Sequence, residues 1–146
     1  MHRFSIRMRT GLLAGVVLLA GGSWPAFPAG VVMIANAGAG VSEASSEDVK
    51  LLFLGSKSAL GSSGRLEPVI LKGGPAHEEF LKTYVGKTDT AFRNHFKSLV
   101  FTGKSSMPKS FNSDEDVIGY VGKTSGAIGY VGAAATLSGV KAVAVK

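Results

Sequence analysis

The chain has 146 residues, no cysteine and a formal net charge of +6 at pH 7. The lack of cysteine excludes a disulfide framework and a lipid-modified N-terminal cysteine, so stability has to come from packing. The basic residues are scattered and form no cationic run, which argues against nucleic acid as a partner.

Residues 1–29 have the order of a secretory signal peptide. Arg3, Arg7 and Arg9 precede an apolar run from Gly11 to Ala20, and a stretch rich in small residues and proline follows. The ten residues of the run reach roughly 15 Å as a helix, about half of a bilayer core. A cleaved signal peptide is therefore favoured over a permanent membrane anchor, and we expect a periplasmic protein.

Two positions fit the small-residue pattern of a cleavage site. One is Ala29 and the other is the triplet Ala35-Asn36-Ala37, which lies far beyond the apolar run. Cleavage near Ala29 is favoured because Val31–Ile34 then becomes the first buried strand. Residues 30–146 then form one domain. It has thirteen basic and ten acidic residues, because three of the sixteen basic residues lie before the cleavage site.

The mature chain alternates between strand and helix patterns. Short apolar or alternating segments predict strands over residues 31–35, 66–71, 127–131 and 140–145. Apolar residues at helical spacing predict helices over residues 46–54, 75–85, 89–99 and 114–122, and residues 100–112 are predicted to be a loop. Pro68 indicates an edge strand or an early position in its strand.

The predicted helices carry recognisable start and stop signals. Ser45, Thr88 and Ser113 are suitable N-caps, and Gly55 and Gly86 are suitable stops. The helix after Ser113 begins with three acidic residues, which complement the helix dipole. These signals predict where each helix begins and ends, but they do not predict how the helices pack together.

Three Gly-Lys-Thr/Ser triplets resemble the end of a phosphate-binding loop, but none has the glycine that such a loop needs five residues earlier. A better candidate for anion binding is the turn formed by Lys72, Gly73, Gly74, Ala76 and His77. Glycines allow close approach of the backbone, and the N–H groups at a helix start favour negative charge. An ordinary strand-to-helix turn remains the alternative.

Metal binding and catalysis find little support in the sequence. His77 and His95 have no second ligand at metal spacing, and a packed histidine is the simpler interpretation of each. Asp114, Glu115 and Asp116 point in different directions on a helix and fit a cap better than a cation site. We predict no metal, no cofactor and no enzymatic activity.

Three motifs resemble the phosphate-type family of periplasmic substrate-binding proteins, which serve ABC transporters. They are Phe53-Leu54-Gly55, Gly126-Ala-Ile-Gly-Tyr130, and Phe101-Thr-Gly-Lys104 followed by Met107-Pro-Lys109. The resemblance implies an α/β fold equivalent to a single lobe of the type II periplasmic-binding fold, with a small mixed sheet flanked by helices. It also implies phosphate or another oxyanion as ligand and an ABC transporter permease or another envelope protein as partner.

Two departures from the family suggest that binding is weak or lost. Full-length members bind phosphate with a Ser-Gly-Thr turn, whereas this chain has Gly74-Pro75-Ala76, and 117 residues leave no room for a facing lobe. The leading hypothesis is an exported solute-binding-type protein with little remaining affinity. The alternative is an envelope interaction module that binds no small ligand and contacts a membrane or sensor partner.

Overall fold

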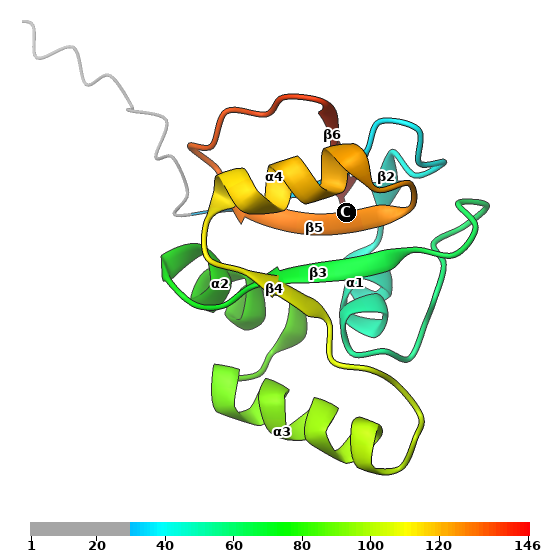
Figure 1. Ribbon diagram of the computed structural model, residues 1–146, viewed down its shortest axis with the longest axis vertical. Coiled ribbons are helices and arrows are strands. Elements are labelled where there is room, and N and C mark those ends of the chain that lie inside the picture. The colour runs from blue at the N-terminus through cyan, green and yellow to red at the C-terminus, as the bar shows by residue number, and fades with distance from the viewer. Residues whose placement is uncertain (1–29) are drawn as a thin grey trace, which may run out of the picture.

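A mixed sheet of six strands forms the centre of the protein. The computed structural model describes residues 30–146, so the predicted signal peptide lies outside the described residues. The sheet order is β2-β6-β1-β5-β3-β4 (Figure 1). The strands are β1 (Val31–Asn36), β2 (Glu43–Ala44), β3 (Glu67–Leu71), β4 (Lys109–Phe111), β5 (Ala127–Gly132) and β6 (Val140–Val145).

The strand directions bring the ends of several strands to the same edge of the sheet. β3 is parallel to β4 and β5, whereas β1 is antiparallel to β5 and β6. The carboxyl ends of β3, β4 and β5 therefore meet the start of β1 at the same edge. In open sheets with parallel strands this edge is the usual location of a ligand site.

The helices begin where the sequence predicts. They are α1 (Ser46–Phe53), α2 (Pro75–Phe80), η1 (Leu81–Val85), α3 (Asp89–Phe101) and α4 (Asp114–Lys123). The side chains of Ser45, Thr88 and Ser113 accept hydrogen bonds from backbone N–H groups in the first turns of α1, α3 and α4. The predicted N-caps are therefore confirmed.

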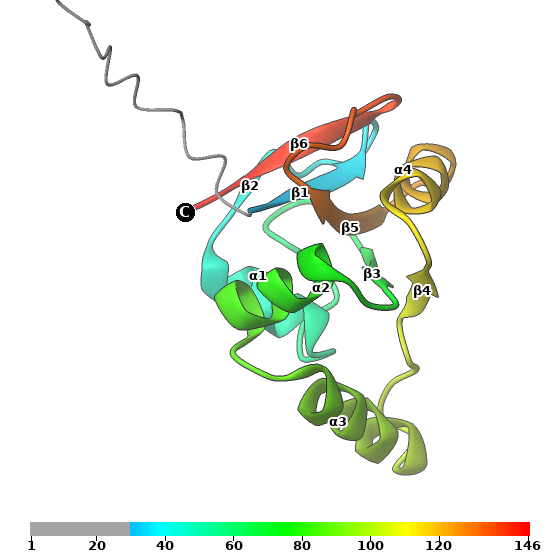
Figure 2. The ribbon, with the colours of Figure 1, turned by 90° about the vertical axis from the view of Figure 1, so that its left-hand side faces the viewer.

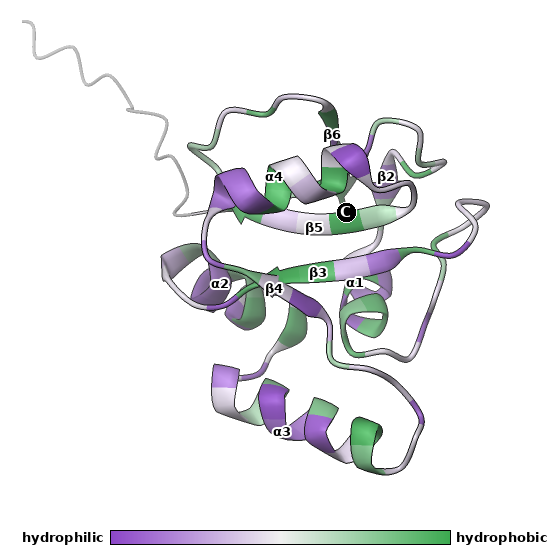
Figure 3. Ribbon diagram, in the orientation of Figure 1, coloured by the Kyte–Doolittle hydropathy of each residue, from purple (hydrophilic) through white to green (hydrophobic). Residues whose placement is uncertain are grey.

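The helices form two layers around the sheet. α4 covers one face, and α1, α2 and η1 lie on the other (Figure 2). α3 is set apart from the sheet and packs beside the end of α1, where His95 Nε2 lies 2.8 Å from the carbonyl oxygen of Leu54. Its apolar face buries Phe92 and Phe96, and Figure 3 shows that its other face is largely hydrophilic.

Aromatic rings dominate the core between the sheet and α2. Tyr130 of β5 stacks on Phe80 at a centroid distance of 3.8 Å, and Phe53 of α1 contacts both rings. All three side chains are buried. Stacked and edge-on rings contribute beyond the area that they bury, so this cluster fixes α1 and α2 against β5.

The predicted small mixed sheet flanked by helices is confirmed, with three local differences. The loop predicted over residues 100–112 is wrong in part, because α3 extends to Phe101 and Lys109–Phe111 form β4. The helix predicted over 75–85 widens into the π-helix η1, where the Gly86 N–H donates to Leu81 O. The two-residue strand β2 is not predicted at all.

The two short strands that the sequence did not predict have a common physical origin. β2 and β4 are too short to carry an alternating pattern and are defined only by their pairing with β6 and β3.

Pro68 is the second residue of β3, and β3 is an interior strand of the sheet. Of the two positions that the sequence allowed for this proline, the early position in its strand is therefore confirmed and the edge strand is not. Within residues 30–146, no helix has the length and apolar character needed to cross a bilayer.

Candidate functional site

The turn between β3 and α2 leaves its backbone open. Lys72, Gly73 and Gly74 are exposed, and a Cβ atom added at either glycine would meet nothing within 4 Å. Gly74 has φ 95° and ψ 175°, a conformation that essentially only glycine adopts, and Pro75 takes the first helical position. The sequence therefore produces a turn whose main chain a ligand can approach closely.

Backbone donors are available at this turn. In the part of the chain that the structure describes, the N–H groups of Gly73, Gly74, Ala76 and His77 make no hydrogen bond within the protein, and Glu78 N–H is the first to bond, to Gly74 O. Pro75 contributes no N–H. Free N–H groups at a helix start favour an anion.

Negative charge lies close to these donors. Asp114, the first residue of α4, accepts a hydrogen bond through Oδ2 from Gly132 N–H at 3.3 Å. A Cβ atom added at Gly132 would lie 3.2 Å from that Oδ2 and 3.9 Å from the Cβ of Ala76. Asp114 therefore borders the same edge as α2, and together with Glu78 it opposes an anion there.

A chain of hydrogen bonds runs beneath the turn. The buried His77 ring bonds through Nδ1 to the Tyr130 hydroxyl and through Nε2 to Asp89 Oδ1 at 2.7 Å. Asp89 Oδ2 accepts from Arg93 Nε at 2.8 Å, and the same guanidinium donates to Lys72 O at 3.0 Å. The network joins β5, α2 and α3 to the carbonyl of the turn.

The donors and acceptors of this network can be assigned. Leu71 N–H donates to the Tyr130 oxygen at 3.2 Å, and burial raises the pKa of this phenol well above its usual value, so the hydroxyl keeps its proton. Tyr130 then donates to His77 Nδ1, and Nε2–H donates to Asp89. The hydrogen bond from Arg93, and secondarily that from His77, lowers the pKa of Asp89.

This geometry divides the five candidate residues by what they can offer. Gly73, Gly74 and Ala76 present backbone, and Lys72 presents an exposed cation beside it. His77 presents only its N–H, because both ring nitrogens already have partners inside the protein. The network members Asp89, Arg93 and Tyr130 escaped the sequence reasoning, since 12 to 53 residues separate them from His77 and no local pattern connects such positions.

His95 belongs to the packing of α3. Its Nε2 lies 2.8 Å from Leu54 O, and its ring meets Phe96 edge-on at 5.4 Å. This confirms the predicted packed histidine. No group of three histidine or acidic side chains within residues 30–146 could hold a metal ion.

No protein-family model and no curated protein matches the sequence, but solved structures match the fold. A protein assigned as a phosphate ABC transporter substrate-binding protein from Clostridium perfringens, solved with bound phosphate, matches with TM-score 0.61 and 16% identity. An ABC-type phosphate transport receptor from Vibrio cholerae and PstS from Borrelia burgdorferi both match with TM-score 0.57, at 14% and 15% identity. Each match covers 80% of this chain.

This chain has the fold of one lobe of those binding proteins. It spans only 44%, 46% and 47% of their lengths, in the same order. The single-lobe fold expected from the motifs is therefore confirmed. At 14–16% identity the likeness shows the fold and leaves the ligand open.

Proposed function

We propose that this protein is an exported, non-enzymatic solute-binding protein that binds phosphate or another oxyanion weakly. The ion is held by the turn of Lys72, Gly73, Gly74, Ala76 and His77. Lys72 contributes its ammonium group, and the other four residues contribute their backbone N–H groups. The observation that carries the proposal is the set of unpaired N–H groups at the exposed turn after β3. This turn lies at the sheet edge where ligands commonly bind.

The affinity follows from the small number of contacts. Micromolar binding needs about 8 kcal/mol. A helix start contributes about 0.3–1 kcal/mol, and a charge-assisted hydrogen bond about 1.5–3 kcal/mol. An open turn beside Asp114 and Glu78 offers few such contacts and is therefore expected to bind in the millimolar range.

Export is proposed from residues 1–29, with the mature domain at residues 30–146 in the periplasm. The place of β1 supports cleavage near Ala29 over cleavage at Ala37. β1 pairs with β5 on one side and β6 on the other, and Met33, Ile34 and Ala35 are buried. Removing it would open the middle of the sheet. Mass spectrometry of the exported protein would identify the N-terminus.

Titration with phosphate, sulfate and molybdate tests the binding site. We expect millimolar dissociation constants by NMR, with the largest shifts at the Gly73, Gly74 and Ala76 amides. Lys72→Gln should weaken binding about threefold, whereas Lys82→Gln, an exposed lysine on η1, should leave it unchanged. Submicromolar binding by a monomer would contradict the weak-binding proposal.

The proposed partners are an ABC transporter permease or another envelope protein. If none of the three oxyanions shifts the turn amides at high concentration, the oxyanion proposal is wrong. The remaining hypothesis would then be the envelope interaction module. Co-purification with a permease would favour the transport role.

A further inference from the structure

The end of α3 exposes an unusual amount of apolar surface. Phe101 is 93% exposed, Val100 50% and Met107 38%, and in the described part of the chain the only other large hydrophobic side chain this exposed is Leu137. Figure 3 shows the hydrophobic colouring of this last helical turn, at the end of α3 that points away from the sheet. Three such side chains within eight residues form a patch rather than scattered exposure.

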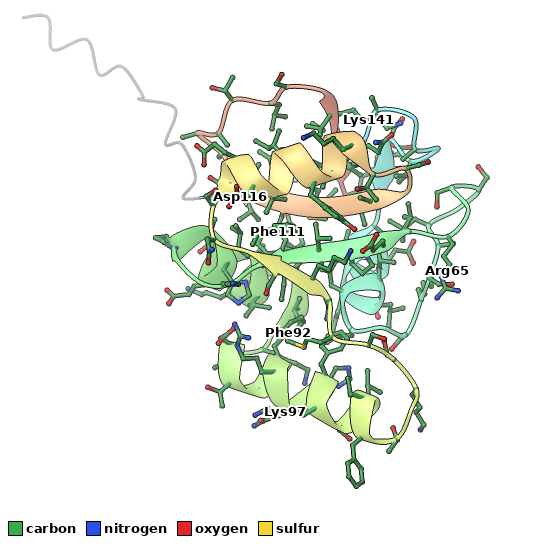
Figure 4. All side chains as sticks on the ribbon, viewed as in Figure 1. Arg65, Phe92, Lys97, Phe111, Asp116 and Lys141 are labelled. Atoms are coloured by element: carbon green, nitrogen blue, oxygen red, sulfur yellow. The ribbon has the colours of Figure 1, made fainter. Side chains whose placement is uncertain are left out.

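The apolar side chains border a hollow of about 460 Å³ that is also lined by Arg93 and Lys97. Figure 4 shows Lys97 on the outer side of α3, away from the core side where Phe92 lies. We refer to Lys97, Val100, Phe101, Lys104 and Met107 as the α3 tip.

The charge around the α3 tip has one sign. Residues 90–113 contain four basic residues and no acidic one. Arg93 is paired with Asp89, and Lys109 lies near Glu67 and Tyr120. Lys97 and Lys104 make no ion pair or hydrogen bond through their ammonium groups within residues 30–146. These two lysines therefore favour a negatively charged occupant of the α3 tip.

This charge argues against two occupants from the chain itself. In a symmetric dimer through the α3 tip, Lys97 and Lys104 would face the same lysines of the second copy, because a twofold interface matches one patch with itself. Residues 1–29 carry three arginines and no acidic residue, so their charge is also of the wrong sign. Neither gives complementarity.

The size of the α3 tip favours a lipid surface over a folded protein. A stable protein interface usually takes about 20–30 residues on each side. Peripheral membrane binding needs fewer groups, namely apolar side chains that enter the acyl boundary and cations that stay among the headgroups. Phe101 and Val100 provide the first, and Lys97 and Lys104 provide the second.

We propose that the α3 tip docks this protein onto an anionic phospholipid membrane. Phe101, Val100 and Met107 enter the interface, while Lys97 and Lys104 contact lipid phosphates. The proposal does not depend on oxyanion binding at the β3–α2 turn, since Phe101 lies about 12 Å along α3 from Arg93, the residue that contacts that turn.

Vesicle co-sedimentation of the full chain tests the proposal. We expect binding to vesicles of phosphatidylglycerol and phosphatidylcholine (1:1) that weakens with added salt, and much less binding to phosphatidylcholine alone. Lys97→Gln with Lys104→Gln should weaken binding about 25-fold, and Phe101→Ser about tenfold. Lys82→Gln and Leu137→Ser are the matched controls and should bind as the unchanged chain does. All variants share residues 1–29, so any binding by that segment is a constant background.

Fluorescence gives a second readout, which reports whether the side chain at position 101 itself enters the membrane interface. Trp24 is the only tryptophan, so a Trp24→Phe chain can carry a single reporter as Phe101→Trp or, as control, Leu137→Trp. Anionic vesicles should blue-shift the emission of the first and leave the second unchanged. Equal vesicle affinity of the α3-tip variants and the controls, or no blue shift at position 101, would overturn the proposal. So would a photocrosslinker at position 101 that reacts in cells mainly with a protein, which would identify an acidic protein surface instead.

Discussion

The Tyr130 hydroxyl in β5 and the His77 ring in α2 share a hydrogen bond that solvent does not reach. It links the centre of the sheet to α2, the helix that begins at the candidate site. The same hydroxyl accepts the Leu71 N–H at the end of β3. One phenol oxygen therefore holds both sides of the turn.

Tyr130→Phe should destabilise the protein more than its lost atom suggests. It leaves His77 Nδ1 and Leu71 N–H buried without a partner, and each such group costs about 1–3 kcal/mol. We expect a loss of about 2–4 kcal/mol in urea unfolding. Tyr120→Phe is the control, because the Tyr120 hydroxyl bonds to Glu67 on a half-exposed surface and should cost less than about 1 kcal/mol. Similar losses for both variants would show that the buried network contributes little.

Asp89 should make the stability depend on pH below about 4. Arg93 and His77 lower the pKa of Asp89 in the folded protein below its ordinary value of 3.8. The unfolded chain therefore binds the proton first, so the stabilisation is complete above the unfolded-state pKa and is lost as the pH falls through the folded-state pKa. Asp89→Asn should flatten the pH dependence of the unfolding free energy below about pH 4.

The loss at neutral pH should be small for Asp89→Asn, about 0.5–1 kcal/mol, because the carboxylate is 42% exposed and an amide oxygen can still accept from His77. Glu115→Gln is the control, as Glu115 is exposed and has no ion pair within residues 30–146. An acid limb as steep in Asp89→Asn as in the unchanged protein would contradict the assignment.

Two glycines should respond in opposite directions to alanine. A Cβ atom at Gly129 in β5 would lie 2.9 Å from Val69 Cγ2 and 3.0 Å from Val117 Cγ1, so Gly129→Ala should cost about 1–3 kcal/mol. Gly119 lies on the exposed side of α4 with nothing within 4 Å, and Gly119→Ala should stabilise by about 0.5–1 kcal/mol. Thermal unfolding of the pair checks both signs. A stabilising Gly129→Ala would show that β5 can move away from α4.

Ser113→Ala should cost about 1 kcal/mol. The Ser113 side chain accepts the Asp116 N–H at 3.2 Å and caps α4, which the three acidic residues of the first turn already support. Ser125→Ala, in the turn after α4, should change stability by less than about 0.5 kcal/mol. Denaturant midpoints at constant m-value would measure the difference.

The sequence determined the parts of this protein that depend on neighbouring residues. N-caps at Ser45, Thr88 and Ser113, the stop at Gly86 and the apolar run Val31–Ile34 are local signals, because a helix turn or a strand is specified within a few positions. The motifs at 53–55 and 126–130 were enough to predict the single-lobe fold. The open turn at Gly73-Gly74 followed from its glycines and proline.

Only the tertiary structure decided which of these elements meet. It placed β1 antiparallel between β5 and β6, created the short strands β2 and β4 by pairing, and brought Asp114 to the edge where α2 begins. It also enclosed His77 between Tyr130 and Asp89, which turned a candidate ligand side chain into a hydrogen-bonded support of the turn. Such contacts join residues tens of positions apart, and their energy arises from packing that no local stretch of sequence specifies.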